Sequence, residues 1–423
     1  MKNLILYTCI ILFHFFTIDS EAQLYAIKAN RLIDGKSDSL HHDITIVIED
    51  NKIKDSGKNI EIPANAKMII LADKTILPGL VDVHTHIMFD GSDDYGADIY
   101  KNSIPYRAIR AVFFVRKALW SGFTSMRDMC SEGTMYADVD IKKAIDKHIV
   151  PGPRLWVATR GLSIPGFYYP LGYSWDLDLP KGTQIVSGAD ECLRAVREQI
   201  ANGADWIKVF ADWDFHIDED GGISGQTTFT EEELKVIVTE AHRLGHKVAA
   251  HAMSRDGIKA ALIAGVNSIE HGAGFDEELI ELAKANGVFW CPTLLPPEHM
   301  ITQNESQFLT QILEIEHKAL HIAYHKGLKI VLGTDAGAYP WSVNQAKEFE
   351  FLVNKAGFSP MDAIKAGTSI AAELLDQSDK IGYLAPGMYA DIIAVPGDPL
   401  KDISVLQDVM FVMKDGEIFR QDK

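Results

Sequence analysis

Short stretches of alternating apolar and polar residues occupy both ends of the chain. Each is bounded by turn residues, a pattern typical of β-strands. They cover residues 25–29, 44–48 and 67–71 near the start and residues 390–395, 409–413 and 417–419 near the end. Neither set is long enough to form a sheet domain alone. We therefore predict one small β-sandwich assembled from residues 23–79 and residues 379–423.

Apolar runs alternate with amphipathic stretches through the middle of the chain. The apolar runs expected to be strands are residues 80–86, 123–127, 154–159, 206–210, 247–251, 268–271, 288–291 and 329–333. Helix-start patterns lie between them: Thr230 precedes three glutamates in a capping-box pattern, and Ser359 precedes a proline. This alternation predicts an α/β fold, a (β/α)8 TIM-like barrel over residues 80–378. The active site of such a barrel lies at the C-terminal ends of its strands.

Residues 1–22 have the pattern of an export signal. Lys2 is followed by an apolar run at residues 4–16, and small residues precede a cleavage point after Ala22. A membrane-spanning helix needs roughly 18 apolar residues, and His14 interrupts this shorter run. We expect a signal peptide that is cleaved after Ala22, and a periplasmic or secreted protein without a membrane anchor.

The composition narrows the classes of partner. The 423 residues include 41 lysines and arginines against 59 aspartates and glutamates, which gives a formal net charge of −18. A nucleic-acid-binding face must be basic, so we expect a small-molecule partner and no nucleic acid, with a homo-oligomer allowed. Beyond the export signal, Cys130, Cys192 and Cys291 are too few for a disulfide framework, and at least one must be free.

Four histidines and one aspartate are expected at the same end of the predicted strands. His84 and His86 close the first strand, where residues i and i+2 face the same side. His251, His271 and Asp335 end the fifth, sixth and eighth strands. In a barrel these side chains would converge, and imidazoles mixed with a carboxylate are suitable ligands for catalytic zinc. The spacing therefore predicts a catalytic metal site with open coordination positions.

Lys208 lies inside the apolar fourth strand, at residues 206–210. A buried ammonium without a partner is costly, and the simplest interpretation is a lysine that pairs with a carboxylate or extends to solvent. Next to the metal ligands another interpretation is favoured. Reaction with carbon dioxide would make the lysine an anionic carbamate, whose two oxygens can bridge two divalent cations.

Six motifs in the chain point to a known family. They stand at residues 78–86, 122–128, 207–209, 268–272, 333–335 and 386–391. On these motifs nearly the whole mature chain resembles the amidohydrolase superfamily, in its imidazolonepropionase-like and Xaa-Pro dipeptidase-like branch. The resemblance implies two divalent ions, with zinc as the default and manganese or iron as alternatives. The implied ligands, with carboxylated Lys208 and a hydroxide as bridges, are His84, His86 and Asp335 for one ion and His251 and His271 for the other.

The resemblance also implies a reaction: hydrolysis of a carbon–nitrogen amide bond in a dipeptide, an N-acyl amino acid or a related small amide. Metal-activated hydroxide would attack the carbonyl, and Asp335 would move its proton to the leaving nitrogen; a pure ligand role for Asp335 is the alternative. Cyclic-amide hydrolysis of the imidazolonepropionase type and deamination are other candidates, which Lys208 disfavours. A binding protein that has lost catalysis is disfavoured by the complete ligand set.

The loops after the third and fourth strands are expected to face the substrate. We predict substrate contacts by Arg160, Tyr168, Tyr169 and His216, with Arg160 suited to a carboxylate and the rings to an apolar group. Many relatives have Gly-Gly-His after the third strand, whereas residues 163–167 lack it here, so substrate identity does not transfer.

Two more carboxylates stand close to the predicted ligands. Asp82 lies two residues before His84, and it either orients a ligand imidazole or pairs with Arg127. Glu270 alternates away from His271, and we expect it to be structural.

Overall fold

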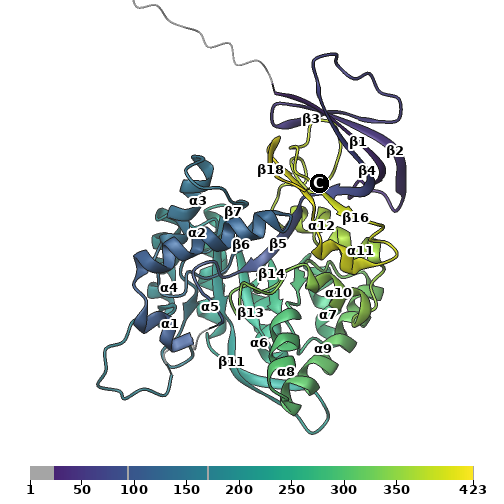
Figure 1. Ribbon diagram of the computed structural model, residues 1–423. Coiled ribbons are helices and arrows are strands. Elements are labelled where there is room, and N and C mark those ends of the chain that lie inside the picture. Colours follow the sequence, from purple (N-terminus) through teal and green to yellow (C-terminus); the bar gives the residue numbers. More distant parts are fainter. Residues whose placement is uncertain (1–22, 93–94, 169–170, 423) are drawn as a thin grey trace, which may run out of the picture.

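Strands from both chain ends form one seven-stranded sheet (Figure 1). The protein is represented by a computed structural model that describes residues 23–92, 95–168 and 171–422. In pairing order the strands are β18 (Glu417–Gln421), β17 (Phe411–Lys414), β16 (Ile392–Pro396), β4 (Lys67–Pro78), β1 (Leu24–Ile33), β2 (Leu40–Glu49) and β3 (Lys52–Gly57). The predicted union of the two ends is confirmed where β16 runs antiparallel to β4, with Ile393 opposite Leu77.

This sheet has a hydrophobic core of its own. Ile27, Ile46 and Ile69 from the first part of the chain pack in one buried cluster with Ile392 and Phe411 from the last part. The predicted β-sandwich is not confirmed, because hydrogen bonding joins all seven strands into a single sheet. The reason is that β4 pairs with β1 on one side and with β16 on the other, so both chain ends share one ladder.

Parallel strands make up the rest of the α/β fold and are divided between two sheets. The smaller sheet has the order β5 (Leu80–Thr85), β6 (Phe123–Asp128) and β7 (Arg154–Val157). The larger has the order β15 (Phe289–Cys291), β14 (Ser268–His271), β13 (Lys247–Ala252), β10 (Trp206–Phe210), β8 (Leu162–Ser163) and β9 (Gln184–Ile185). A separate hairpin is formed by β11 (Asp212–Ile217) and β12 (Ile223–Thr227).

The expected eighth strand, residues 329–333, is not a strand in the structure. Its backbone nevertheless bonds to both neighbours: the Leu332 carbonyl accepts from Val83 of β5, and the Lys329 carbonyl accepts from Trp290 of β15. These contacts, with one bridge between Trp290 and Ile330, do not extend into a ladder. The segment therefore lies between β15 and β5 without completing a sheet.

A second break separates β7 from the larger sheet. β7 ends at Val157 and pairs only with β6. Thr159 then has a φ of 53°, outside the extended range that a strand requires. The prediction of a closed barrel is thus not met, since the strand pairing forms two parallel arcs within a mixed α/β fold.

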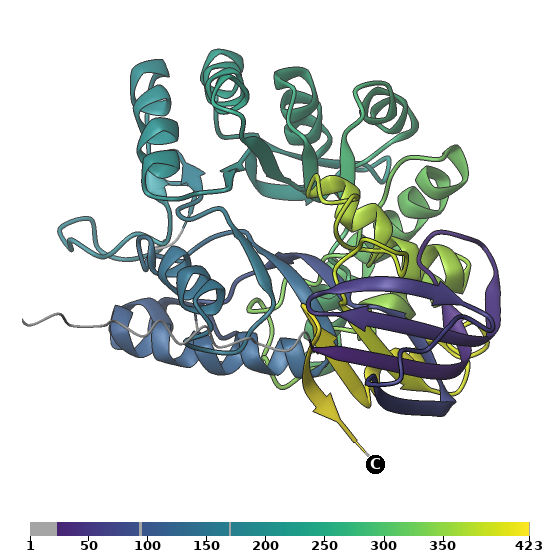
Figure 2. The ribbon, with the colours of Figure 1, turned by 90° about the horizontal axis from the view of Figure 1, so that it is seen from above.

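Helices lie on the outer side of the parallel strands (Figure 2). Two predicted helix starts are confirmed: Thr230 forms the capping box of α5, and Ser359 caps α11 with a proline in its first turn. The helices are α1 (Tyr95–Lys101), α2 (Ile104–Trp120), α3 (Ala137–Asp146), α4 (Ala189–Ala201), α5 (Glu231–Arg243), α6 (Arg255–Ala264), α7 (Glu277–Ala285), α8 (Leu295–Gln303), α9 (Gln307–Lys326), α10 (Lys347–Asn354), α11 (Pro360–Ala366), α12 (Ser369–Leu374) and the 3-10 helix η1 (Ile403–Gln407).

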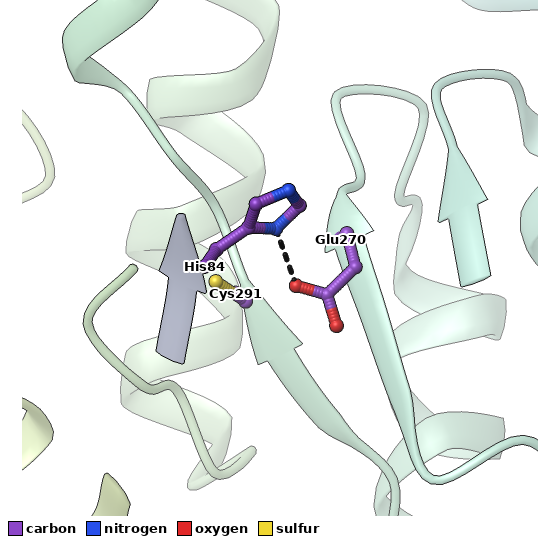
Figure 3. A group of neighbouring side chains, drawn as sticks. All are labelled: His84, Glu270 and Cys291. Carbon is purple, nitrogen blue, oxygen red and sulfur yellow. Dashed lines mark hydrogen bonds and ion pairs between the residues drawn. The ribbon is translucent and has the colours of Figure 1, made fainter. Parts of the chain in front are cut away.

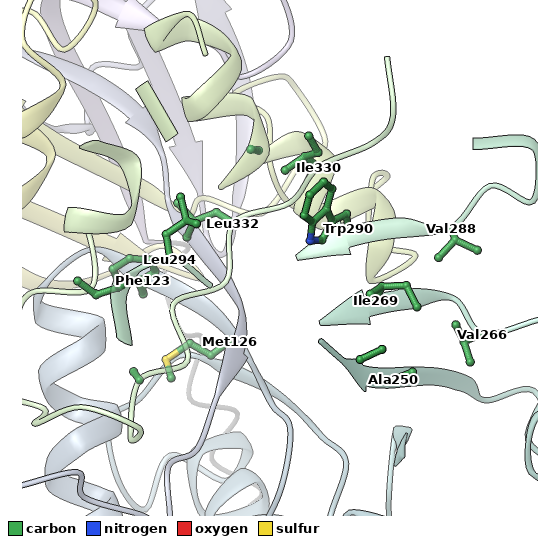
Figure 4. Packing of buried hydrophobic residues seen from close by; sticks show 14 of the residues in the cluster. Phe123, Met126, Ala250, Val266, Ile269, Val288, Trp290, Leu294, Ile330 and Leu332 are labelled. Carbon is green, nitrogen blue, oxygen red and sulfur yellow. The ribbon is translucent and has the colours of Figure 1, made fainter. Parts of the chain in front are cut away.

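The largest hydrophobic core fills the space between these helices and the strands. Trp290 and Ile269 from the larger sheet and Phe123 from the smaller sheet belong to this one cluster (Figure 4). Because both arcs share it, the strand ends that present the site residues are held by one packed interior.

Three expectations concern features other than the sheets. Cys130, Cys192 and Cys291 are buried and form no disulfide. Among the described residues, no helix is long and apolar enough to cross a membrane. The predicted signal peptide, residues 1–22, lies outside the described residues.

Candidate active site

One cavity of about 390 Å³ brings the predicted metal ligands together. They come from the C-terminal ends of β5, β10, β13 and β14 and from the segment that follows Ile330. The predicted ligands in the cavity wall are His84, His86, Lys208, His251, His271 and Asp335. All of them are therefore within reach of one small bound molecule.

The ligand atoms lie close enough to share cations. Oδ1 of Asp335 is 3.1 Å from Nε2 of His86 and 3.6 Å from Nε2 of His84. Donor atoms of His84, His271 and Asp335 lie within 4.8 Å of one another, and the rings of His251 and His271 are 4.6 Å apart. Nε2 of His84 and of His251 are buried and have no hydrogen-bond partner among the described residues. Unsatisfied buried nitrogens of this kind fit metal ligands.

Backbone turns at the strand ends aim two of these side chains. His271 has a φ of 70° and Asp335 a φ of 56°, values that residues other than glycine adopt rarely and at a cost. Gly333 lets the second turn approach β5, because a Cβ there would stand 2.7 Å from Cβ of His84. The strained turns thus bring Asp335 and His271 to the His84 imidazole.

Glu270 has the expected structural role in a buried ion pair with Arg127, and it also contacts a predicted metal ligand. Its Oε2 accepts a 2.7 Å hydrogen bond from Nδ1 of His84 (Figure 3). Its Oε1 accepts from Arg127 at 2.8 Å and from Ser268. The strand alternation fails because the turn at His271 brings two consecutive residues to the same side. Glu270 therefore fixes the orientation of the His84 ring.

Charge keeps Glu270 in its ionised form despite burial. Burial alone would raise its pKa, but Arg127 and Lys208 outweigh it and lower the pKa of Glu270. Cys291 lies beside His84 and Glu270 (Figure 3), and burial raises the pKa of its thiol well above the ordinary value. A protonated thiol is a poor metal ligand, and Nδ1 of His84 is already hydrogen-bonded. This trio is better suited to positioning than to metal binding.

Asp82 organises the backbone rather than an imidazole. Its carboxylate accepts hydrogen bonds from the backbone N–H of His84 at 3.1 Å and from both the N–H and the hydroxyl of Thr334. Arg127 pairs with Glu270 instead, so neither predicted role for Asp82 is met. Burial raises the pKa of Asp82 to about 6. By holding Thr334, Asp82 fixes the residue that precedes Asp335.

Glu132 is a site residue that the sequence did not reveal. It lies after β6, lines the cavity, and its Oε1 is 2.9 Å from Nδ1 of His86. Burial opposes protonation of His86, but the hydrogen bonds that its ring donates to Asp335 and Glu132 raise its pKa to about 10. No motif marks Glu132, since only the fold places its loop beside His86.

The other imidazoles and Lys208 are pushed toward their neutral forms. Burial, and then the charge of Lys208, lowers the pKa of His84 well below its ordinary value and that of His251 to about 3. Burial and the neighbouring His251 likewise lower the pKa of His271. Lys208 is 1% exposed, and burial lowers its pKa. Neutral imidazoles are the form that binds metal.

The structure places part of the residues predicted to contact substrate in the cavity wall. Tyr168 lines the cavity and its hydroxyl donates to Glu132 at 3.0 Å, while Tyr169 lies outside the described residues. Arg160 does not line the cavity: the strand ends before it, and its side chain bonds to Tyr136.

His216 does not line the cavity either. It lies on β11, where alternate residues face opposite sides, and its side chain is 68% exposed beside Asp218. Trp213, on the other face of the same strand, lines the cavity with Phe89 and Phe210. The mouth is therefore aromatic as expected, and Tyr168 is a predicted ring that lines it.

The α/β fold groups the site residues at strand ends, and the chain shares this arrangement with hydrolases of carbon–nitrogen bonds to which it is similar. The sequence pattern of the Amidohydrolase family matches residues 75–419, and the chain belongs to this family. It is 34% identical to ochratoxinase of Aspergillus niger over 95% of this chain and 87% of that protein. It is also 23% identical to imidazolonepropionase of Pyrobaculum arsenaticum, over 83% of this chain and 85% of that protein.

Solved structures show the same relationship. A crystal structure of an Xaa-Pro dipeptidase with methionine bound in its active site superimposes with a TM-score of 0.84 and 32% identity, covering 94% of this chain and 100% of that chain. The crystal structure of Aspergillus niger ochratoxinase gives a TM-score of 0.83 and 31% identity over 95% and 96% of the two chains. The predicted superfamily is thus confirmed.

Proposed function

We propose that this protein is a metal-dependent amidohydrolase that cleaves the amide bond of a dipeptide, an N-acyl amino acid or a related small amide. The observation that supports this most directly is the convergence of four imidazoles, Lys208 and Asp335 on one cavity. The similarity to an Xaa-Pro dipeptidase across 94% of this chain favours a peptide-like amide.

Two divalent cations, zinc by default and manganese or iron as alternatives, would occupy the cavity. His84, His86 and Asp335 would hold one, His251 and His271 the other. The orphaned Nε2 atoms of His84 and His251 and their lowered pKa values support this assignment. When bound, such cations lower the pKa of a water molecule and polarise a carbonyl group.

Lys208 would bridge the two cations as a carbamate. The neutral amine attacks the carbon of carbon dioxide and loses one proton, which leaves an N-carboxylate with one negative charge. Burial supports this step because it lowers the pKa of Lys208 and so favours the neutral amine. Burial outweighs the charges of Glu270 and Asp335, which act on Lys208 in the opposite direction and raise its pKa.

Asp335 would move the proton during hydrolysis. Its side chain stands between His84 and His86 and remains 12% exposed to the cavity, so it can reach both water and substrate. It would accept a proton from the attacking water at a carboxylate oxygen and donate it to the leaving nitrogen. The aromatic walls formed by Phe210, Trp213 and Tyr168 would hold an apolar part of the substrate and exclude bulk water.

The wider setting of the site is part of the same proposal. We propose that the two parallel arcs act as an incomplete (β/α)8 barrel over residues 80–378, with residues 23–79 and 379–423 as an accessory β-domain. We further propose export to the periplasm or medium after cleavage at Ala22. The apolar run at residues 4–16 supports this localisation.

A substrate screen tests the proposed function. Purified, zinc-loaded protein is incubated with a library of dipeptides and N-acyl amino acids, and released amine is measured. We expect hydrolysis of several members, and loss of that activity after chelation. If the metal-loaded protein hydrolyses no member of the library, peptide-like amide hydrolysis is contradicted. Activity on cyclic amides alone would favour the imidazolonepropionase type.

A further inference from the structure

A second cavity of about 170 Å³ adjoins the active site. It shares His271, Met300 and Asp335 with the first cavity, so a molecule held at the predicted ligands can extend into it. The hairpin β11–β12 and helices α8 and α9 enclose it, with the ring of Phe215 stacked on that of Phe308 at 6.0 Å. This side cavity is therefore continuous with the place where an amide would react.

Apart from His271, Thr293 and Asp335 at the end next to the active site, the walls of the side cavity are apolar except at one point on α9. Met253, Leu309 and Ile312 contribute aliphatic surface, and Ile312 belongs to a small buried apolar cluster. Leu309, Ile312 and Glu316 follow at i, i+3 and i+7, which places them on one face of the helix. The Glu316 carboxyl group thus stands in a part of the cavity that otherwise fits a hydrocarbon chain.

Glu316 has no partner among the described residues. Its side chain is only 2% exposed, Oε1 makes no hydrogen bond, and no cation lies within ion-pair distance. The nearby charged groups that act on it are other carboxylates: burial, Glu348 and Glu298 together raise the pKa of Glu316 well above its ordinary value. Glu348, by contrast, accepts hydrogen bonds from the backbone of Leu294 and Leu295.

An unsatisfied buried carboxyl group is costly, and proteins rarely keep one without a use. A cation delivered through the apolar cavity would supply both the missing hydrogen bonds and the missing charge. The resulting ammonium–carboxylate pair would be of the strong, charge-assisted kind because water is excluded.

We propose that the side cavity binds a basic group of the substrate, an alkylammonium or guanidinium at the end of a short aliphatic chain, with Glu316 as its partner. The stem of that group contacts Met253, Leu309 and Ile312 while its N–H groups donate to the Glu316 carboxylate. As a statement about substrates this rests on the proposed amide hydrolysis, and it makes lysine-, ornithine- or arginine-containing dipeptides and N-acyl amino acids the preferred class.

Binding of two amino acids tests the cavity without any turnover. Calorimetric titration of zinc-loaded protein compares L-lysine with L-norleucine, which lacks only the terminal ammonium. We expect lysine to bind at least ~10-fold tighter, the scale of one charge-assisted hydrogen bond. Equal affinities, tighter binding of norleucine, or no binding of either would overturn the proposal, and this comparison needs no variant.

A matched pair of variants on α9 assigns the effect to one side chain. Glu316→Gln keeps the shape and removes the ionisable group, so lysine should bind no better than norleucine while norleucine affinity changes less than ~2-fold. Glu314→Gln changes an exposed glutamate of the same helix and should keep the lysine preference. A preference that survives in Glu316→Gln contradicts the assignment.

The binding result is separable from the proposed function. Lysine preference without hydrolysis of any amide would leave the cation cavity in place and refute amide hydrolysis. Hydrolysis of neutral dipeptides without lysine preference would support the hydrolase and refute the cation cavity.

Discussion

Replacement of Glu270 by glutamine is the sharpest perturbation of the buried network beneath the site. Glu270 is completely buried, and its carboxylate joins Arg127 to the Nδ1 of His84. Glutamine keeps the shape but removes the charge, which leaves the Arg127 guanidinium buried without an ionic partner. It also allows the glutamine amide to turn its NH2 group, a hydrogen-bond donor, toward Nδ1 of His84.

The expected magnitudes follow from this geometry. Breaking a fully buried ion pair by removing one partner costs about 3–5 kcal/mol, so the free energy of unfolding of the metal-free protein should fall by that order. Loss of the carboxylate that orients a ligand imidazole should weaken metal binding about 10–100-fold. Because the pKa of Glu270 is lowered in the folded protein, its contribution exists above its unfolded pKa and is lost as pH falls.

Two assays measure these effects. Urea unfolding of the chelator-treated protein gives the stability change, and competition with a zinc chelator gives the change in metal affinity. Glu278→Gln is the control, since Glu278 is 64% exposed in its pair with Arg255 and should matter by less than about 0.5 kcal/mol. If Glu270→Gln matches wild type in both stability and zinc affinity, the assigned role of this network is refuted.

Three further perturbations address the chemistry and the buried charges. Lys208→Ala should lose most bound metal and activity, with partial rescue by acetate as a substitute bridge; full activity without acetate excludes the carbamate. Asp335→Asn should lower kcat by about 10²–10⁴-fold in amine-release assays, the range of general acid–base catalysis; near wild-type kcat at saturating zinc argues against a proton-carrying Asp335. Burial raises the pKa of Glu348 to about 8. The folded protein is therefore stabilised while Glu348 is protonated, and this contribution to the free energy of unfolding is lost as pH rises from 4.5 to 8. Urea unfolding at pH 5 and pH 8 should show that the free energy of unfolding falls more for wild type than for Glu348→Gln. Equal falls in the two proteins would contradict the raised pKa of Glu348.

The metal-ligand candidates were accessible from the sequence because their signal is local. His84 and His86 are two residues apart in a strand, and His251 ends an apolar run, so periodicity alone indicates where each side chain points. The family motifs reinforced the same positions. The structure places all of these residues in one cavity.

The positioning residues were not accessible, because they depend on backbone turns that periodicity does not describe. The φ of 70° at His271 puts Glu270 and His271 on the same side, against strict alternation. Glu132 meets His86 only through the course of the loop after β6. Conversely, His216 was assigned to a loop, whereas it belongs to a hairpin strand whose alternation turns it to solvent.

The prediction of a closed barrel was not met for a related reason. Counting apolar runs treats residues 329–333 as equivalent to the other strands, yet this segment makes only scattered backbone bonds to β15 and β5. The short β7, which stops before Thr159, leaves the second opening. Strand existence follows from hydrophobic pattern, while ladder formation depends on tertiary placement.

Metal content tests the central claim most directly, because the proposed chemistry depends on a binuclear site. Protein purified with zinc, freed of excess metal and analysed by mass spectrometry should contain about two zinc ions per chain, as in other two-metal hydrolases. The Lys208→Ala variant should contain far less. One ion per chain would contradict the lysine-bridged pair, and the absence of bound metal would contradict the hydrolase mechanism altogether.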